Sequence, residues 1–223
     1  GIAAFRTPAI MVSCSFACTL AFMYLVPQEL QRGLGMSSTL VGLLMLPGGI
    51  VTAVCTLMAG RLFDRHGARV LVWIGVVMAA IGGALFFAIG VDSGVVLFLA
   101  AHIIVMVGIP FIQQSAQSAA LKSLPGRMAA DGSTILNTMQ QVCGAIATAV
   151  ATCLLGLGQT GYAAGGGTNA AQGFVDGSRY GYMFGLVLVA IVLVFSFMLK
   201  GGKEEPKLVP VRVDGGAVES LAV

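Results

Sequence analysis

The chain has 223 residues, of which 57% are hydrophobic and only 9% are charged, with a net charge of +3 and a mean hydropathy of +0.95. Soluble domains carry roughly 25% charged residues, so this composition excludes a globule covered by charged side chains in water. The bilayer is the natural solvent for such a chain, and the small positive charge gives no indication of a nucleic-acid partner.

Six long apolar segments follow one another along the sequence. A spanning helix needs roughly 20 mainly apolar residues, and these segments are too long for barrel strands and lack their alternation. We therefore predict an all-α integral membrane protein, a bundle over residues 1–200 with transmembrane helices at about 7–26, 38–61, 69–89, 94–114, 131–157 and 180–199. We expect a flexible Gly-rich loop at 158–181 and a polar, disordered cytoplasmic tail at 201–223.

The basic residues fall unequally on the two sides of this arrangement. With the N-terminus inside, ten Lys and Arg residues lie on the cytoplasmic side, and Arg32 and Arg179 lie outside. Positive charge accumulates on the cytoplasmic side of short loops. The asymmetry predicts a multi-pass plasma-membrane protein with both termini in the cytoplasm, and it supports the count of six helices.

The loop after the second predicted helix carries the most specific signal. It reads Gly60-Arg-Leu-Phe-Asp-Arg-His-Gly-Ala-Arg69. Glycine at both ends suits a tight reversal because glycine accepts positive φ. Asp64 can meet the positive end of the next helix dipole, or pair with Arg65 or Arg69. The positive-inside rule explains the arginines but leaves the Gly-x3-Asp-Arg-x-Gly spacing unexplained.

This spacing resembles the cytoplasmic-loop signature G-x-L-x-D-R-x-G-R-R of the major facilitator superfamily, with Ala68 in place of one basic residue. Other stretches resemble the C-terminal half of the fourteen-helix drug:proton antiporters. The matching positions of the loop are Gly60, Leu62, Asp64, Arg65, Gly67 and Arg69, and the other stretches are 27–31, 34–38, 42–47, 132–141 and 144–148.

The resemblance implies one half of the major facilitator fold, a 3+3 inverted repeat of six helices. Its partners would be the lipid bilayer and a missing N-terminal six-helix half or a second copy. The start at Gly1 rather than Met agrees with the trailing half of a longer polypeptide. In the family such halves carry a conformational-switch loop, which here comprises Gly60, Asp64, Arg65, Gly67 and Arg69.

The resemblance also implies a function. It is the export of small amphipathic, drug-like compounds by alternating access, coupled to protons, with the acidic coupling residues in the missing part. The residues by themselves leave open a half of a metabolite or sugar transporter of the same superfamily, or a non-transporting membrane scaffold.

In the family fold the first and fourth helices of each half line the cavity, so the resemblance makes side chains on these two predicted helices candidates for a substrate cavity. Hydroxyl and aromatic groups suit amphipathic and cationic substrates. An ionisable residue inside a membrane indicates a functional site, although a lone histidine is more often an interhelical hydrogen-bond partner. The candidates are Ser13, Phe16, Thr19 and Phe22 on the first helix and His102, Gln113 and Gln117 on the fourth. The two glutamines lie toward the cytoplasmic end, where a gate is the alternative.

The fifth predicted helix carries the most polar stripe, with members three or four residues apart on one face. It is either a seam inside this half or the seam against the missing half, where Asn137 and Gln141 would line the cavity. The stripe comprises Ser133, Asn137, Gln141, Gly144, Thr148 and Thr152. Pro47 with Gly48 and Gly49, and Pro110, are predicted hinges, because proline removes a backbone hydrogen bond.

Catalytic and cofactor patterns are missing from the sequence. The five cysteines show no metal-binding spacing, and there is no Gly-x-Ser-x-Gly or His-Glu-x-x-His. A Gly-x4-Gly-Lys-Ser/Thr phosphate loop is also missing. We predict neither an enzyme nor a metal, cofactor or ATP site.

Overall fold

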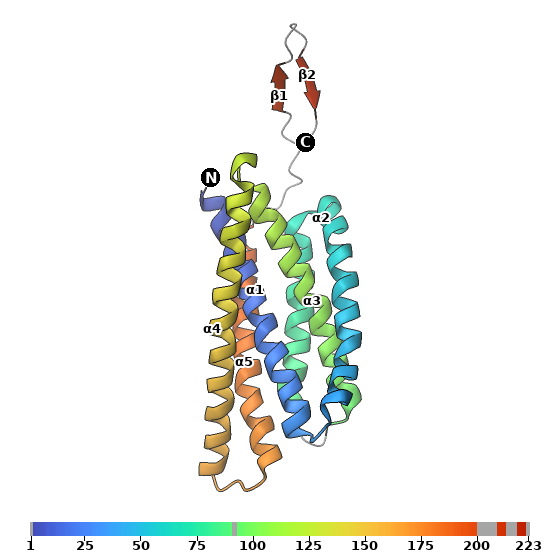
Figure 1. The fold of residues 1–223 in the computed structure, drawn as a ribbon, viewed down its shortest axis with the longest axis vertical. Coiled ribbons are helices and arrows are strands. Elements are labelled where there is room, and N and C mark those ends of the chain that lie inside the picture. Colours follow the sequence, from blue (N-terminus) through green and yellow to red (C-terminus); the bar gives the residue numbers. More distant parts are fainter. Residues whose placement is uncertain (1, 91–92, 200–208, 213–217, 222–223) are drawn as a thin grey trace.

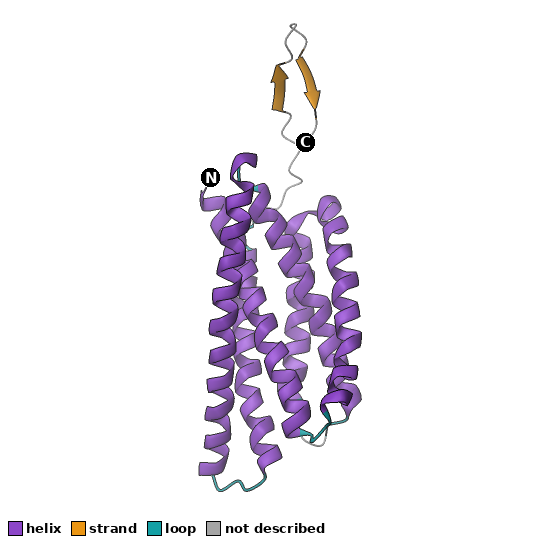
Figure 2. Cartoon of the chain, viewed as in Figure 1, coloured by secondary structure: helices purple, strands orange, loops and turns teal. Residues whose placement is uncertain are grey.

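The computed structural model describes residues 2–90, 93–199, 209–212 and 218–221. Figure 1 shows long helices packed side by side as a bundle, and Figure 2 shows that loops between these helices are confined to its two ends. The helical elements are α1 Ile2–Gln28, the π-helical turn η1 Glu29–Gly33, α2 Ser38–Ala88, α3 Val95–Lys122, the 3-10 turn η2 Gly126–Met128, α4 Ala129–Ala164 and α5 Ala170–Ser196.

The 51 residues of α2 form two antiparallel arms. A straight helix of this length would measure roughly 77 Å, more than twice the ~30 Å hydrocarbon core of a bilayer. At Gly67 the backbone leaves the helical region, with φ 77° and ψ 167°. The first arm (residues 38–66) and the second arm (68–88) are therefore separate passes. With α1, α3, α4 and α5 they make six, and the predicted fold class is confirmed.

The loop between α4 and α5 is shorter than expected. Both helices continue through most of 158–181, and the connection covers 165–169. Asn169 caps α5, because its Oδ1 accepts hydrogen bonds from the backbone N–H groups of Ala171 (3.0 Å) and Gln172 (3.3 Å). Gly158 and Gly177 lie in direct contact where the two helices cross. Gly158 and Gly177 thus serve close packing of the two helices, whereas Gly165, Gly166 and Gly167 lie in the short connection.

An aromatic cluster occupies the core. The rings of Phe86 and Tyr182 stack with centroids 4.9 Å apart, and Phe98 meets Phe86 edge-on at 5.1 Å. Phe22 completes the cluster from α1. These side chains come from α1, the second arm of α2, α3 and α5, so the cluster ties four of the six passes together.

The tail contains two short strands. Strand β1, Val209–Arg212, pairs antiparallel with β2, Val218–Leu221. We predicted disorder over 201–223. The remainder of that range lies outside the described residues, so the tail as a whole stays a prediction.

Candidate functional site

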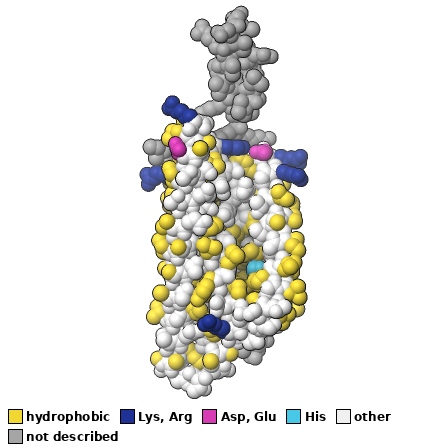
Figure 3. Space-filling view, viewed as in Figure 1, with side chains coloured by type: hydrophobic (Ala, Val, Ile, Leu, Met, Phe, Trp, Pro, Cys, Tyr) yellow, Lys and Arg dark blue, Asp and Glu magenta, His cyan; other side chains and the backbone are white. Residues whose placement is uncertain are grey.

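The candidate site is the face on which α1 and α3 lie between α4 and the first arm of α2, which we call the open face (Figure 1). Of the most apolar window of α4, 28% is buried, against 61% for α1 and 56% for α3. Figure 3 shows this face, with hydrophobic side chains along its length and basic side chains gathered mainly at one end. We call that end the basic end; the chain carries there the exposed residues Arg6, Arg61, Arg65, Arg69, Lys122 and Arg127.

The four candidates on α1 do not share one face. Phe16 and Thr19 are half-buried, and the Phe16 ring lies beside Gly144 of α4. Ser13 is buried, and its hydroxyl donates to the carbonyl of Ala9 at 2.9 Å. Phe22 is buried in the aromatic core against α5. Phe16 and Thr19 are therefore the α1 candidates that remain near the open face.

His102 on α3 is buried against the first arm of α2. Its imidazole occupies the space where a side chain at Gly48 would lie. One turn further along α3, the hydroxyl of Thr52 donates to the carbonyl of Met106 at 3.5 Å. The structure places His102 in a helix–helix contact, and it gives Gly48 a packing role.

The predicted hinges lie within continuous helix. In the described part of α2, Gly67 is the one residue with non-helical dihedrals, so the first arm passes through Pro47 and Gly49 without a break. Pro110 is likewise enclosed in α3 and is buried. The hinge role of these residues stays a prediction.

Two amide side chains meet between α3 and α4. The Nε2 of Gln113 donates to the Oε1 of Gln140 at 3.3 Å, and Gln140 is 5% exposed. Within the described residues the Nε2 of Gln140 has no partner. Gln117, one turn closer to the basic end, is half-buried. The polar stripe pointed to Gln141 and missed Gln140, because the two differ by about 100° around the helix.

The polar stripe of α4 divides between two environments. Gly144 is buried against Leu20 and Phe16 of α1, which is the internal seam. Asn137 and Gln141 are exposed on the outer side of α4. An amide in hydrocarbon without a hydrogen-bond partner costs several kcal/mol. In hydrocarbon, this side of α4 would therefore need water or another protein surface against it.

The predicted switch loop is a helical reversal at the basic end. Gly67 has the positive φ that we expected, whereas Gly60 is helical and the expectation of positive φ there is wrong. Asp64 Oδ1 lies 3.2 Å from Nζ of Lys122, the last residue of α3. The same ammonium group stands 4.5 Å from the ring centroid of Phe63. The ion pair thus joins the reversal to α3, in place of the expected partners Arg65 and Arg69.

Glu29 is a functional candidate that sequence reasoning missed. It is 1% exposed in the π-helical turn after α1, and its Oε2 accepts a hydrogen bond of 2.5 Å from the Tyr182 hydroxyl. Our predicted helix ended at residue 26, which placed Glu29 in a loop. The renewed apolar residues Leu30 and Leu34 were the available signal. π-Helical turns occur frequently at functional sites.

The open face offers aromatic, amide and hydroxyl groups on rigid helices. Among the described residues no group of three His, Cys, Asp or Glu side chains is arranged to hold a metal ion. Such a surface can bind a molecule with an apolar body and a few polar groups, and it brings together no nucleophile and base.

Comparison with known proteins identifies relatives along most of the chain. Residues 2–148 match the family model of the Major Facilitator Superfamily. The chain is 35% identical over 205 residues to the lincomycin resistance protein LmrB of Listeria monocytogenes, covering 89% of this chain and 43% of that protein. It is 34% identical to the protein of the same name from Bacillus subtilis, over 86% of this chain and 41% of the relative. A multidrug resistance protein B homolog of Mycobacterium tuberculosis is 29% identical over 133 residues, 59% of this chain and 25% of the relative. The chain therefore spans less than half the length of these curated relatives.

Proposed function

The chain belongs to the Major Facilitator Superfamily, and on that basis we propose that it is the C-terminal half of a proton-coupled transporter that exports amphipathic, drug-like compounds by alternating access. Transporters of this superfamily are generally carriers and not enzymes, and the chain is a membrane protein. Two relatives are named for resistance to lincomycin and one for multidrug resistance, which supports export of drug-like molecules.

The observation that carries the proposal is the outer side of α4. It presents the amides of Asn137 and Gln141 on the least buried helix of the bundle. Lipid does not hydrogen-bond such groups, whereas a second six-helix bundle, or water held between two bundles, does. The length of the relatives leaves room for that second bundle in the complete protein.

Substrate recognition is assigned to the open face. The half-buried Phe16 and Thr19 of α1 and Gln113 and Gln117 of α3 supply aromatic, hydroxyl and amide groups. Few fixed polar groups on an apolar wall suit amphipathic molecules of varied shape. Rocking of the two bundles would expose this face to each side of the membrane in turn.

The resemblance placed the acidic coupling residues in the missing part, but we assign proton coupling to Glu29 of this chain. Its carboxyl group lies within a membrane-spanning segment and is hydrogen-bonded by Tyr182, a neutral donor. A protonated carboxyl can donate a hydrogen bond and a carboxylate only accepts, so gain or loss of the proton changes the contact between α1 and α5. The predicted orientation puts Glu29 toward the external side, from which protons enter.

The main test is efflux of a fluorescent lipophilic cation from cells that lack their own exporters. We expect extrusion when the chain is co-produced with the N-terminal half of a relative, and none with the chain alone. Asp64→Asn in the pair should abolish extrusion at equal membrane abundance. If the pair moves no dye although both halves reach the membrane and associate, drug export is contradicted, and metabolite transport or a scaffold role takes its place.

The coupling role of Glu29 is tested in vesicles that contain the pair. Glu29→Gln keeps an acceptor for the Tyr182 hydroxyl but has no proton to gain or lose, so we expect dye transport driven by a pH gradient to fall to the rate measured without a gradient. Exchange of dye without a gradient should persist. Asp131→Asn, which alters an exposed carboxylate at the start of α4, is the matched control and should leave both activities unchanged. Equal gradient-driven transport in both variants would rule out Glu29.

A further inference from the structure

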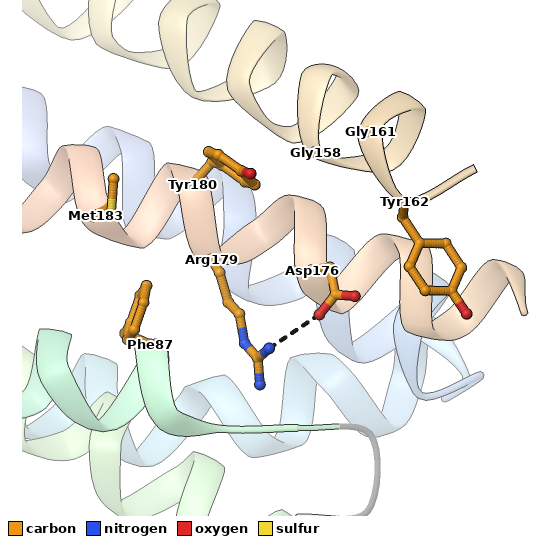
Figure 4. A pocket seen from close by; sticks show the side chains of 8 residues that line it. All are labelled: Phe87, Gly158, Gly161, Tyr162, Asp176, Arg179, Tyr180 and Met183. Atoms are coloured by element: carbon orange, nitrogen blue, oxygen red, sulfur yellow. Dashed lines mark hydrogen bonds and ion pairs between the residues drawn. The ribbon is translucent and has the colours of Figure 1, made fainter. Parts of the chain in front are cut away.

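A cavity of about 530 Å³ opens at the end of the bundle opposite the basic end. Phe87, at the end of α2, forms one wall, and Gly158, Gly161 and Tyr162 of α4 form another. The remaining wall is α5, which contributes its residues 176, 179, 180 and 183 (Figure 4).

This cavity is separate from the open face. On α5, Gly181 and Gly185 contact Leu25 and Phe22 of α1. Tyr180 and Met183 lie on the opposite side of α5 and are 51% and 50% exposed. The cavity therefore faces the surroundings of the bundle, which in a membrane are lipids, and not the cavity shared with a second bundle.

One charge of each sign lies side by side in the cavity. Arg179 Nη1 donates to Asp176 Oδ1 at 3.0 Å, and the two side chains are 36% and 28% exposed. Nη2 of Arg179 donates to the carbonyl of Ile89 at 3.4 Å, at the carboxyl end of α2. A guanidinium has five N–H donors, so these two bonds leave further donors for a ligand. A lone cation would be repelled by Arg179 and a lone anion by Asp176, whereas a zwitterion can place an opposite charge beside each of the two side chains.

The cavity changes character with depth. Figure 4 shows Tyr162 and Asp176 nearest the turn between α4 and α5, then Arg179, with Phe87 and Met183 further along. Met183 lies seven residues beyond Asp176, roughly 10 Å along the helix axis toward the membrane interior. Polar and tyrosine side chains therefore stand at the rim, where the lipid head groups are, and apolar side chains lie below them.

We propose that this cavity binds the head group of a zwitterionic phospholipid. Its phosphate would accept hydrogen bonds from Arg179, and its ammonium group would lie against Asp176 and the ring of Tyr162. The first carbons of an acyl chain would pack on Phe87 and Met183. The site needs only the bilayer and these helices, so it is independent of the proposed export function.

Two glycines of α4 provide a matched pair of variants. A Cβ at Gly161 meets nothing within 4 Å, so Gly161→Leu places a side chain in the cavity without moving the backbone. Gly156 lies in the same helix with equally open surroundings and does not line the cavity. Gly156→Leu therefore carries the same change of composition and helix propensity. Arg179→Gln removes the proposed phosphate ligand.

The experiment is native mass spectrometry of the purified 223-residue chain titrated with three lipids that have the same acyl chains. They are phosphatidylethanolamine, the anionic phosphatidylglycerol and a phosphate-free cationic lipid. We expect phosphatidylethanolamine to bind about tenfold more tightly than the other two, the scale of one charge-assisted hydrogen bond. Gly161→Leu and Arg179→Gln should each remove that preference, and Gly156→Leu should retain it.

Other outcomes overturn the proposal. Equal binding of the three lipids to the unsubstituted chain would show that the charged pair does not select a head group. Preference for the cationic lipid would indicate a site for amphipathic cations. If Gly156→Leu loses the preference as fully as Gly161→Leu, the lipid binds elsewhere.

Discussion

At Gly48 of α2 an added Cβ would overlap the His102 imidazole, whereas a Cβ at the neighbouring Gly49 would meet nothing within 4 Å. We expect Gly48→Ala to destabilise the bundle by about 1–3 kcal/mol, because overpacking displaces either the histidine or the helix. Gly49→Ala should stabilise the helix by up to about 1 kcal/mol. Unfolding of the purified variants in mixed detergent micelles with increasing SDS measures both changes.

His102→Ala separates this explanation from a general need for glycine. In the Gly48→Ala background it frees the space that the new methyl group requires, so we expect it to restore part of the lost stability. If the two single glycine variants have the same stability, the contact between Gly48 and His102 is not the constraint described above.

Prediction of single residues from sequence succeeded where only one residue type adopts the required backbone conformation without strain. Gly67 was placed at a reversal because glycine accepts positive φ, and it has that φ, whereas Gly60, placed on the same ground, is helical. Glu29 and Gln140 were missed, because a hydropathy window does not resolve where a helix ends or which of two adjacent amides faces inward. Phe22 was assigned to a cavity, but the aromatic partners that enclose it come from α2 and α5 and are distant in sequence.

The reversal of α2 depends on one backbone conformation. The dihedral angles of Gly67 lie where side chains with a Cβ are strained, by roughly 1–3 kcal/mol per residue. We expect Gly67→Ala to lower stability by that amount and to weaken the contact of Asp64 with Lys122. Gly60→Ala, in regular helix with nothing within 4 Å of its Cβ, is the control. Thermal unfolding of the two variants in detergent should separate them, and equal transitions would contradict a special role for Gly67.

The elements themselves were largely predictable. Six apolar stretches of spanning length specify six passes, because the bilayer demands internal backbone hydrogen bonds. The ends of the helices were less predictable. The capping side chain of Asn169 extends α5 back into a stretch rich in glycine, and the π-helical turn extends α1 to Gly33. Where a helix ends depends on single side-chain contacts, and the amino-acid composition of a segment does not reveal those contacts.

At the scale of the whole molecule, the second bundle should cover the outer side of α4. Thr152, a member of the polar stripe that includes Asn137 and Gln141, is exposed on that helix, and Val187 is 53% exposed on the side of α5 away from α1. In variants whose single cysteine is introduced by Thr152→Cys or by Val187→Cys, we expect co-production of the N-terminal half of a relative to slow maleimide labelling at 152 severalfold. Labelling at 187 should not change. Mass spectrometry of the labelled chain gives both rates.

Equal protection at 152 and 187 would show general shielding, and no protection at either would contradict the proposed contact. The sequence predicted a polar stripe on this helix but left its direction open. Gly144 faces α1 and the amides face outward because of the way α4 packs on α1. The spacing of polar residues along the sequence does not determine that packing.

The uncovered amides of α4 have a consequence for how much of the protein a cell can hold. A chain that meets no partner bundle keeps Asn137 and Gln141 in contact with lipid, and quality-control proteases remove poorly assembled proteins continuously. We therefore expect these 223 residues, when produced by themselves, to be degraded faster than when they are produced together with the N-terminal half of a relative.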